Sequence, residues 1–269
     1  MKPEHGPLKP SGPRVIAIAN QKGGVGKTTT AINLGTALAA TKKRVVILDL
    51  DPQGNASTGF GIERTDRQLN VYHLLIGQAT VAEAIKETDI PGLSIVPSGV
   101  DLSGAEIELV GMENREFYLK KAIGRGAEDF DYVLIDCPPA LGLLTLNALA
   151  AADALLVPLQ CEFFALEGIS HLLRTVERVK RTVNPTLEIQ GIVLTMFDSR
   201  NRLSDMVASD VRAHFGDKVY KTVIPRNVRV SEAPSHGRPV LIYDINCAGS
   251  RAYLHLAGEV LRRERLAVA

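Results

Sequence analysis

A short stretch near the start of the chain, NQKGGVGKTTT at positions 20–30, has the residue types of a loop that binds phosphate groups. Gly26, Lys27 and Thr28 match the last three positions of the pattern G-x-x-x-x-G-K-[ST], while Gln21 stands where the first glycine is expected. In such loops backbone N–H groups point at phosphate oxygens, the lysine reaches the β- and γ-phosphates, and the hydroxyl contacts Mg²⁺. The stretch predicts nucleotide binding by Gly23, Gly24, Val25, Gly26, Lys27, Thr28 and Thr29.

The alternative for this stretch is a glycine-rich turn that binds nothing. The flanking residues argue against it, because RVIAIAN at 14–20 is an apolar, β-branched run typical of a buried strand. TTTAINLGTALAA at 28–40 is rich in helix-forming residues. A strand, a loop and a helix in this order form an anion site at the helix N-terminus, so nucleotide binding is favoured.

Carboxylates stand at the ends of two other apolar runs. RVVILDLDPQGN contains Asp49 and Asp51, and DYVLIDCPP contains Asp136. A carboxylate at the end of a buried strand is unfavourable unless a cation or a partner neutralises it, and Mg²⁺ is such a cation. We expect Asp136 to hold the metal through water beside Thr28, Asp49 to support the metal shell, and Asp51 to orient the attacking water. The alternative is that these residues cap the turns that follow them.

Strand-like apolar runs alternate with helical patterns along the chain. We expect strands in VIAIA, RVVILDL, LSIVPS, DYVLIDC, ALLVPL, IQGIVLT and VYKTVIP, with PVLIYD as a further candidate. Residues 101–125 and 166–183 are expected to be largely helical. This alternation predicts a single α/β domain with a largely parallel, twisted sheet flanked by helices. In such a sheet the ligand lies beyond the carboxyl ends of the strands, where the candidate site residues fall.

Length, composition and charge limit the kind of protein. We expect one domain over residues 14–269 and a disordered tail over residues 1–13, which is neither a signal peptide nor a membrane anchor. Aromatic residues are only 5% and Trp is absent, which argues against a surface that stacks bases. The three cysteines form no C-x-x-C motif, as is typical of reduced thiols in a cytosol. The net charge is +1, but from residue 171 onward 16 basic residues face 10 acidic ones.

The motifs KGGVGKTT, DLDPQGN and IDCPP resemble those of the deviant Walker-A ATPases, and in particular the ParA-type partition ATPases, called Soj in chromosomal systems. TMFDSRNRLSDMV and VYKTVIPRNVRVSEAPSHGRPVLIYD extend the resemblance, which covers nearly the whole chain from Arg14. It implies the deviant Walker-A P-loop NTPase fold and a Mg²⁺-dependent hydrolysis of ATP to ADP and phosphate.

Lys22 is a lysine that an ordinary phosphate loop does not require. In this family the extra lysine reaches across a dimer interface to the phosphates of the nucleotide bound by the other subunit. The resemblance therefore implies that Lys22 is a nucleotide-binding and catalytic residue supplied in trans, beside Asp51. A second ammonium group there stabilises the negative charge of the transition state and couples dimerisation to ATP. From the loop alone, a solvated lysine is the alternative.

Further assignments come from the resemblance. It implies adenine contacts by Met196, Pro225 and Asn227, for which loop packing is the alternative. Arg200 and Arg229 match positions that bind double-stranded DNA without sequence preference, although an exposed arginine is often only solvated. The implied partners are a second copy in an ATP-bound homodimer, non-specific DNA, and a ParB-type centromere-binding protein that stimulates hydrolysis. The implied location is the cytoplasm, at the nucleoid.

The beginning and the end of the chain bear on alternative functions. The loop begins near residue 21, so we do not expect the N-terminal helix-turn-helix domain of the large plasmid ParA proteins, or operator-specific repression. MinD-type relatives end in an amphipathic helix that binds membranes, and a positioning ATPase of that kind is the alternative function. A third alternative is an iron-sulfur reductase like the nitrogenase iron protein, but this chain lacks suitable cysteines for a cluster. We favour core packing over membrane binding for the apolar stripe of the last helix, Tyr253, Leu256, Ala257, Val260 and Leu261, and expect no membrane partner.

Overall fold

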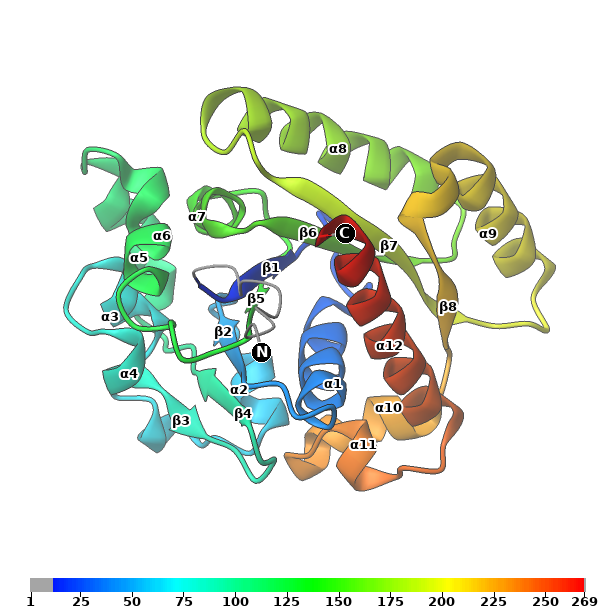
Figure 1. Cartoon of the computed structure of the whole chain (residues 1–269), viewed down its shortest axis with the longest axis horizontal. Coiled ribbons are helices and arrows are strands. Elements are labelled where there is room, and N and C mark those ends of the chain that lie inside the picture. The colour runs from blue at the N-terminus through cyan, green and yellow to red at the C-terminus, as the bar shows by residue number, and fades with distance from the viewer. Residues whose placement is uncertain (1–11, 269) are drawn as a thin grey trace, which may run out of the picture.

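The computed structural model describes residues 12–268, so most of the tail expected over residues 1–13 lies outside the described residues. An eight-stranded sheet runs through the middle of the molecule in the order β3-β4-β2-β5-β1-β6-β7-β8 (Figure 1). All neighbouring strands are parallel except β3 and β4. The predicted single α/β domain with a largely parallel sheet is confirmed. The strands are β1 (Arg14–Ile18), β2 (Val45–Asp49), β3 (Lys86–Glu87), β4 (Leu93–Val96), β5 (Tyr132–Asp136), β6 (Ala154–Gln160), β7 (Glu188–Phe197) and β8 (Val219–Pro225).

The central strands are apolar along their whole length because helices cover both faces of the sheet. All five residues of β2 and of β5 are buried. Each of the seven expected apolar runs contains a strand. The added strand, β3, is a two-residue antiparallel edge strand whose sequence, Lys-Glu, has no hydrophobic pattern.

The helices form one layer on each face of the sheet (Figure 1). One hydrophobic core lies under α3 (Val71–Leu75), α4 (Val81–Ala84), α5 (Leu102–Val110), α6 (Tyr118–Ile123), α7 (Leu143–Ala151), α8 (Ala165–Thr182) and α9 (Arg202–Phe215). The other lies under α1 (Lys27–Ala39), α2 (Asn55–Gly59), α11 (Val240–Tyr243) and α12 (Ala248–Val268). The remaining elements are α10 (Val228–Glu232) and the 3-10 turns η1 (Arg64–Asp66), η2 (Arg115–Phe117), η3 (Gly216–Lys218) and η4 (Ala233–His236).

Two expectations about local structure were wrong in part. The candidate strand PVLIYD forms the short helix α11, in which Val240 and Leu241 are buried while Ile242 is exposed. The backbone N–H of Val240 donates to Asn33 Oδ1 of α1 at 2.8 Å, so the run packs against α1 instead of extending the sheet. The helical region expected over 101–125 is two helices, α5 and α6, with Asn114 between them in a left-handed conformation at φ 53°.

The last helix belongs to the core. The side chains of Tyr253, Leu256, Ala257 and Val260 are buried, and Leu261 is partly buried against the same cluster. The helix packs on α1 and β8, and the core packing expected for its stripe is confirmed. Within residues 12–268, every helix is too short or too polar to traverse a lipid bilayer.

Candidate nucleotide site

The phosphate loop lies between the end of β1 and the start of α1, as the sequence predicted. Gly24 and Gly26 have φ of 74° and 85°, in the left-handed region that glycine adopts without a steric penalty. Thr195 at the end of β7 donates from Oγ1 to the carbonyl oxygen of Val25 at 2.9 Å. The turn of the loop is therefore set by its glycines and fastened to a second strand.

A second attachment holds the start of the loop. Asn20 donates from Nδ2 to the carbonyl oxygen of Pro158 in β6 at 2.7 Å, and its Oδ1 accepts from the backbone N–H of Lys22 at 3.1 Å. The loop is thereby fixed to β6 and β7, two strands on the same side of β1, before any ligand binds. Such preorganisation lowers the entropy that phosphate binding would cost.

Lys27 is the first residue of α1, and its side chain turns back into the loop. Its Nζ donates to the carbonyl oxygen of Lys22 at 2.9 Å, and the residue is buried. Burial lowers the pKa of Lys27, and the nearby Asp136 carboxylate opposes that shift. A buried ammonium group with one carbonyl partner has capacity for further acceptors, which phosphate oxygens supply.

Asp49 and Asp136 end two adjacent strands and stand directly opposite each other in the register of β2 and β5. Both are fully buried. Within the described residues, neither oxygen of Asp136 has a hydrogen-bond partner of good geometry, although the Thr28 hydroxyl is close enough to lower the pKa of Asp136. Oδ2 of Asp49 accepts from the backbone N–H and Oγ of Ser57 at 2.8 and 2.6 Å, and its Oδ1 has no partner.

Burial dominates the electrostatics of this pair. It raises the pKa of Asp49 to about 6, against the lowering effect of the Ser57 hydrogen bonds, and raises the pKa of Asp136 well above its ordinary value. Two buried carboxylates with unpartnered oxygens are unfavourable unless a cation joins them. The free energy of this arrangement therefore improves when positive charge enters.

The donor atoms fit Mg²⁺. Carboxylate and hydroxyl oxygens from Asp49, Asp136 and Thr28 are hard ligands of the kind that this ion prefers. In the part of the chain that the structure describes, no group of three or more His, Cys, Asp or Glu side chains surrounds a common point. Mg²⁺ commonly keeps several waters and binds substrate phosphates, so a sparse set of protein ligands suits it.

Asp51 lies in the loop that follows β2, at the same edge of the sheet. It is nearly buried, and its Oδ1 accepts from the backbone N–H of Gln53 at 3.0 Å. Its charge acts on Lys27 and Asp136, which places it electrostatically in the same cluster. The structure thus gathers Asp49, Asp51 and Asp136 around the phosphate loop, as expected from their positions at strand ends.

Within a single chain the Lys22 side chain is paired with a carboxylate that does not belong to this cluster. Its Nζ forms an ion pair with Glu162, which lies in the loop after β6. Sequence reasoning missed Glu162. The available signal was a carboxylate two residues beyond a buried strand, which is the same signal that identified Asp51.

The candidate adenine contacts lie at the ends of β7 and β8. Met196 has a left-handed φ of 50°, which is uncommon for a residue with a side chain. Pro225 is paired in register with Phe197, so the structure places Met196 and Pro225 on neighbouring strand ends. Asn227 caps α10, accepting at Oδ1 from the backbone N–H of Val230 at 3.3 Å.

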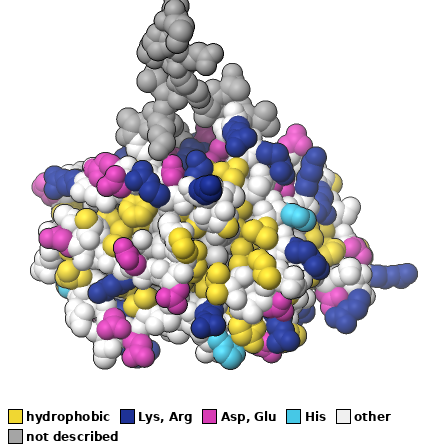
Figure 2. Space-filling view, turned by 60° about the horizontal axis from the view of Figure 1, so that its bottom comes forward, with side chains coloured by type: hydrophobic (Ala, Val, Ile, Leu, Met, Phe, Trp, Pro, Cys, Tyr) yellow, Lys and Arg dark blue, Asp and Glu magenta, His cyan; other side chains and the backbone are white. Residues whose placement is uncertain are grey.

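The two candidate DNA contacts are exposed but already paired with carboxylates. Arg200 donates from Nε and Nη2 to the two oxygens of Asp198 at 2.9 Å each, and this lowers the pKa of Asp198 to about 2. Arg229 pairs with Glu232 at 3.0 Å and Asp244 at 3.6 Å. Figure 2 shows the face toward which α10 and α11 lie, with hydrophobic side chains in its middle and many Lys and Arg side chains along its upper and right margins.

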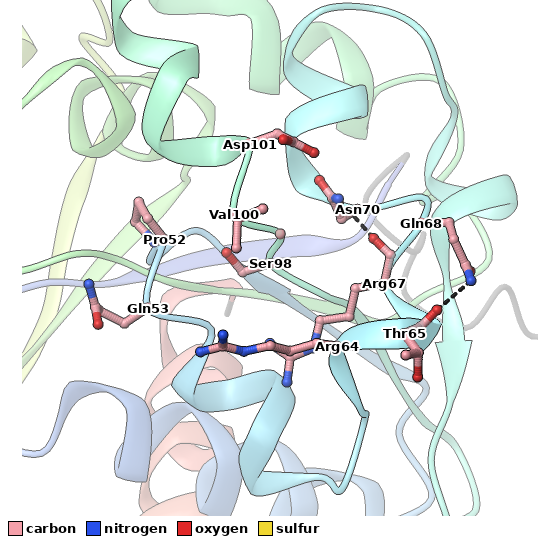
Figure 3. Close-up of a pocket in the computed structure, with 11 residues that line it drawn as sticks. Pro52, Gln53, Arg64, Thr65, Arg67, Gln68, Asn70, Ser98, Val100 and Asp101 are labelled. Atoms are coloured by element: carbon pink, nitrogen blue, oxygen red, sulfur yellow. Dashed lines mark hydrogen bonds between the residues drawn. The ribbon is translucent and has the colours of Figure 1, made fainter.

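A cavity of about 370 Å³ borders the loop that carries Asp51 (Figure 3). Arg67 is buried there and donates to the carbonyl oxygen of Ile62 and to Thr58 Oγ1 at 3.1 and 3.0 Å. Sequence reasoning did not single out this cavity, because its lining comes from segments distant in the chain. The lining residues are Pro52, Gln53, Arg64, Thr65, Arg67, Gln68, Asn70, Ser98, Gly99, Val100 and Asp101.

Comparisons with known proteins bear on the family of this chain. A family model described as an AAA domain matches residues 13–189. The chain is 64% identical over 254 residues to the chromosome partitioning protein ParA of Caulobacter vibrioides, covering 94% of this chain and 95% of that protein. It is 53% identical over 247 residues to the sporulation initiation inhibitor protein Soj of Bacillus subtilis, covering 92% of this chain and 98% of that protein.

A solved structure with the same fold is the cobyrinic acid a,c-diamide synthase of Mycobacterium smegmatis with a bound ATP analog and magnesium. It has a TM-score of 0.84 and 38% identity, and the match covers 95% of this chain and 97% of that one. Coverage is nearly complete in all three comparisons, and the higher identity is to the partition proteins. The chain therefore belongs to the ParA/Soj family of chromosome-partitioning ATPases.

Proposed function

We propose that the chain binds ATP with Mg²⁺ and hydrolyses it to ADP and phosphate. The observation that carries this proposal is the pair of buried carboxylates, Asp49 and Asp136, whose unpartnered oxygens lie beside a preformed phosphate loop. Bound Mg²⁺ would neutralise charge on these carboxylates and on the phosphates. The solved structure that carries an ATP analog and magnesium supports the assignment of both ligands.

Each residue of the site has a role in this proposal. The backbone of 23–29 cradles the phosphates, and Lys27 exchanges the carbonyl of Lys22 for phosphate oxygens. Thr28 and Asp136 hold the metal, and Asp49 is oriented by Ser57 to support its shell. Asp51 orients the attacking water. Met196, Pro225 and Asn227 hold the adenine at the ends of β7 and β8.

The active form in this proposal is a dimer of two ATP-bound chains that face each other across their phosphate loops. Lys22 is partly exposed at the rim of its loop, so a facing subunit has access to it. If the Lys22 side chain leaves Glu162 and contacts the nucleotide of the partner, it brings a second ammonium group to the transition state. The negative charge of that transition state is spread over phosphate oxygens. In this proposal the Lys22–Glu162 ion pair exists in the monomer and is broken when the dimer forms.

The dimer binds double-stranded DNA without sequence preference through Arg200 and Arg229. Both side chains are exposed, Arg200 in the loop after β7 and Arg229 in the short helix α10 that follows the adjacent strand β8, and a two-fold dimer presents each of them twice. A ParB-type centromere-binding protein stimulates hydrolysis, which separates the dimer and releases it from DNA. This cycle at the nucleoid, within the cytoplasm, segregates a chromosome or plasmid.

A membrane-associated positioning ATPase of the MinD kind is less well supported. The apolar stripe of α12 is buried against α1 and β8, so membrane insertion of this helix would remove Tyr253 and Leu256 from the core. Withdrawing a fully buried side chain such as Leu256 would leave a cavity in the core, and the loss of a buried leucine side chain costs about 2–5 kcal/mol. The same residues therefore favour partition over membrane positioning.

The deciding experiment compares binding to DNA with binding to liposomes under the same nucleotide conditions. Asp51→Ala protein with ATP and Mg²⁺ is applied to random-sequence duplex DNA and, separately, to anionic liposomes. We expect retention on DNA with ATP, none with ADP, and no flotation with liposomes. ATP-dependent flotation without DNA retention would replace the partition function with the membrane alternative. Isothermal titration of the parent chain with ATP, with and without Mg²⁺, tests the nucleotide site independently.

A further inference from the structure

Helix α5 presents an apolar strip that nothing in the described chain covers. Val100, just before the helix, is 71% exposed, and within it Ile107 is 80% and Val110 is 59% exposed. Ile107 and Val110 lie three positions apart, which puts them on one side of the helix, and Val100 lies in the turn that leads into it. Met112, just beyond the helix, is also exposed. The opposite side of the helix, with Leu102, Ala105 and Leu109, packs in the core.

Acidic side chains surround this strip. Residues 100–117 contain five acidic residues, Asp101, Glu106, Glu108, Glu113 and Glu116, and one basic residue, Arg115. Within residues 12–268 none of the five carboxylates forms an ion pair. Glu108 accepts from the Tyr72 hydroxyl at 3.0 Å, which raises the pKa of Tyr72, with a smaller contribution from Asp101. Arg115 donates to the carbonyl oxygen of Val110 at 2.6 Å, so the charge around the strip is mixed, with an excess of negative charge.

The same helix touches the segment that leads away from the proposed metal site. Oε1 of Glu106 accepts from the backbone N–H of Leu144, in the first turn of α7, at 3.2 Å. Residues 137–142 join this turn to Asp136 at the end of β5. Figure 1 shows α5 and α6 together at one side of the molecule, beside α7. A ligand that moves α5 would therefore displace the segment after Asp136.

We propose that the strip of Val100, Ile107, Val110 and Met112, with its acidic surround, is the docking surface for a basic amphipathic segment of the protein that stimulates hydrolysis. This inference rests on the proposed function, which includes such a partner. Apolar side chains of the segment cover the strip while its Lys or Arg side chains face Glu108 and Glu113. The contact of Glu106 with α7 couples docking to the site.

The test measures ATP hydrolysis with DNA while the ParB-type protein encoded in the same genome is titrated. Ile107→Ser/Val110→Ser removes the strip, and Glu108→Lys/Glu113→Lys reverses its surround. We expect each double variant to raise the half-maximal partner concentration at least about tenfold, as loss of central interface contacts does. Hydrolysis without partner and ATP-dependent DNA retention should stay within about twofold of the parent, since none of these residues lines the nucleotide site.

Matched control variants are Met206→Ser on α9 and Glu177→Lys on α8, which remove an exposed apolar and an exposed acidic side chain elsewhere. Both should respond to the partner like the parent. If the parent is stimulated and the α5 variants respond equally, the docking surface is refuted while the proposed function stands. If the parent is not stimulated, the proposed function fails first, and the inference fails with it.

A photo-crosslinker at position 107 identifies the occupant directly. Crosslinks to the partner protein that are lost in 0.5 M salt support the proposal. At about this salt concentration the Debye length falls below about 5 Å, so attraction between charged side chains is screened. Crosslinks only to a second copy of the chain would overturn it, because the strip would then be a self-interface.

Discussion

Replacing Glu162 by Gln should strengthen the ATP-dependent dimer. In the single chain Lys22 is held by Glu162, and the proposed trans contact requires Lys22 to leave that carboxylate. Gln keeps the size of the side chain and removes its charge. Lys22 is then free to reach the nucleotide of the partner without first losing an ion pair.

The size of the effect follows from the exposure of the pair. The side chains of Lys22 and Glu162 are 47% and 33% exposed. An ion pair with this much solvent access contributes about 0.2–1 kcal/mol. A symmetric dimer breaks two pairs, so the change amounts to about 0.4–2 kcal/mol, or an approximately 2- to 30-fold lower dimer dissociation constant.

The assay is sedimentation velocity or mass photometry in an Asp51→Ala background, where slow hydrolysis preserves the ATP state. A Lys22→Ala/Glu162→Gln double variant closes a thermodynamic cycle, and we expect Glu162→Gln to have no effect when Lys22 is absent. An unchanged or weaker dimer with Glu162→Gln would refute the reasoning. It would mean that Glu162 supports Lys22 in the dimer instead of holding it back.

Three other predictions address the site, the DNA surface and stability. Asp51→Ala should dimerise but hydrolyse ATP poorly, whereas Lys22→Ala should fail at both. Light scattering with ATP and Mg²⁺ measures dimerisation and phosphate release measures hydrolysis; normal dimerisation of Lys22→Ala would remove its trans role. Interferometry at two salt concentrations should show that Arg200→Glu or Arg229→Glu abolishes DNA retention while dimer mass is unchanged, and parent-like binding by both would direct attention to other basic residues. Asp136→Asn should raise the melting temperature of the nucleotide-free protein by roughly 2–10 °C at pH 8, because it removes an unpartnered buried carboxylate. Burial raises the pKa of Asp136, so the folded chain gains stability on protonation; the advantage of Asn should shrink as pH falls, and a growing advantage in acid would contradict this account.

The sheet and the phosphate loop were predictable because their signals are local. Buried strands such as β2 and β5 are short apolar runs, and the loop is a contiguous motif between a strand and a helix. The prediction that Asp49 and Asp136 gather at one edge needed only the rule that parallel strands align their carboxyl ends. The run at 239–244 was ambiguous, since a short apolar segment suits a strand or a helix and tertiary packing decides.

The partners of the site residues were not predictable from local patterns. Glu162 meets Lys22 across 140 positions of the chain, and Ser57 reaches Asp49 because α2 folds back over the end of β2. Glu106 meets Leu144 only because α5 and α7 lie on the same face of the sheet. Such contacts depend on strand order and helix placement, which composition and periodicity do not specify. Roles within the site therefore need the fold as well as the motif.

The segments at the ends of β7 and β8 each carry a candidate base contact and a candidate DNA contact within a few residues. Met196 precedes Arg200 by four positions, and Asn227 precedes Arg229 by two. Thr195, next to Met196, is bonded to the phosphate loop itself. Linkage between two ligands is reciprocal, so any factor by which ATP raises the affinity for DNA must also be the factor by which DNA raises the affinity for ATP. Chromosomal DNA would then favour the ATP-bound form of the protein that moves it.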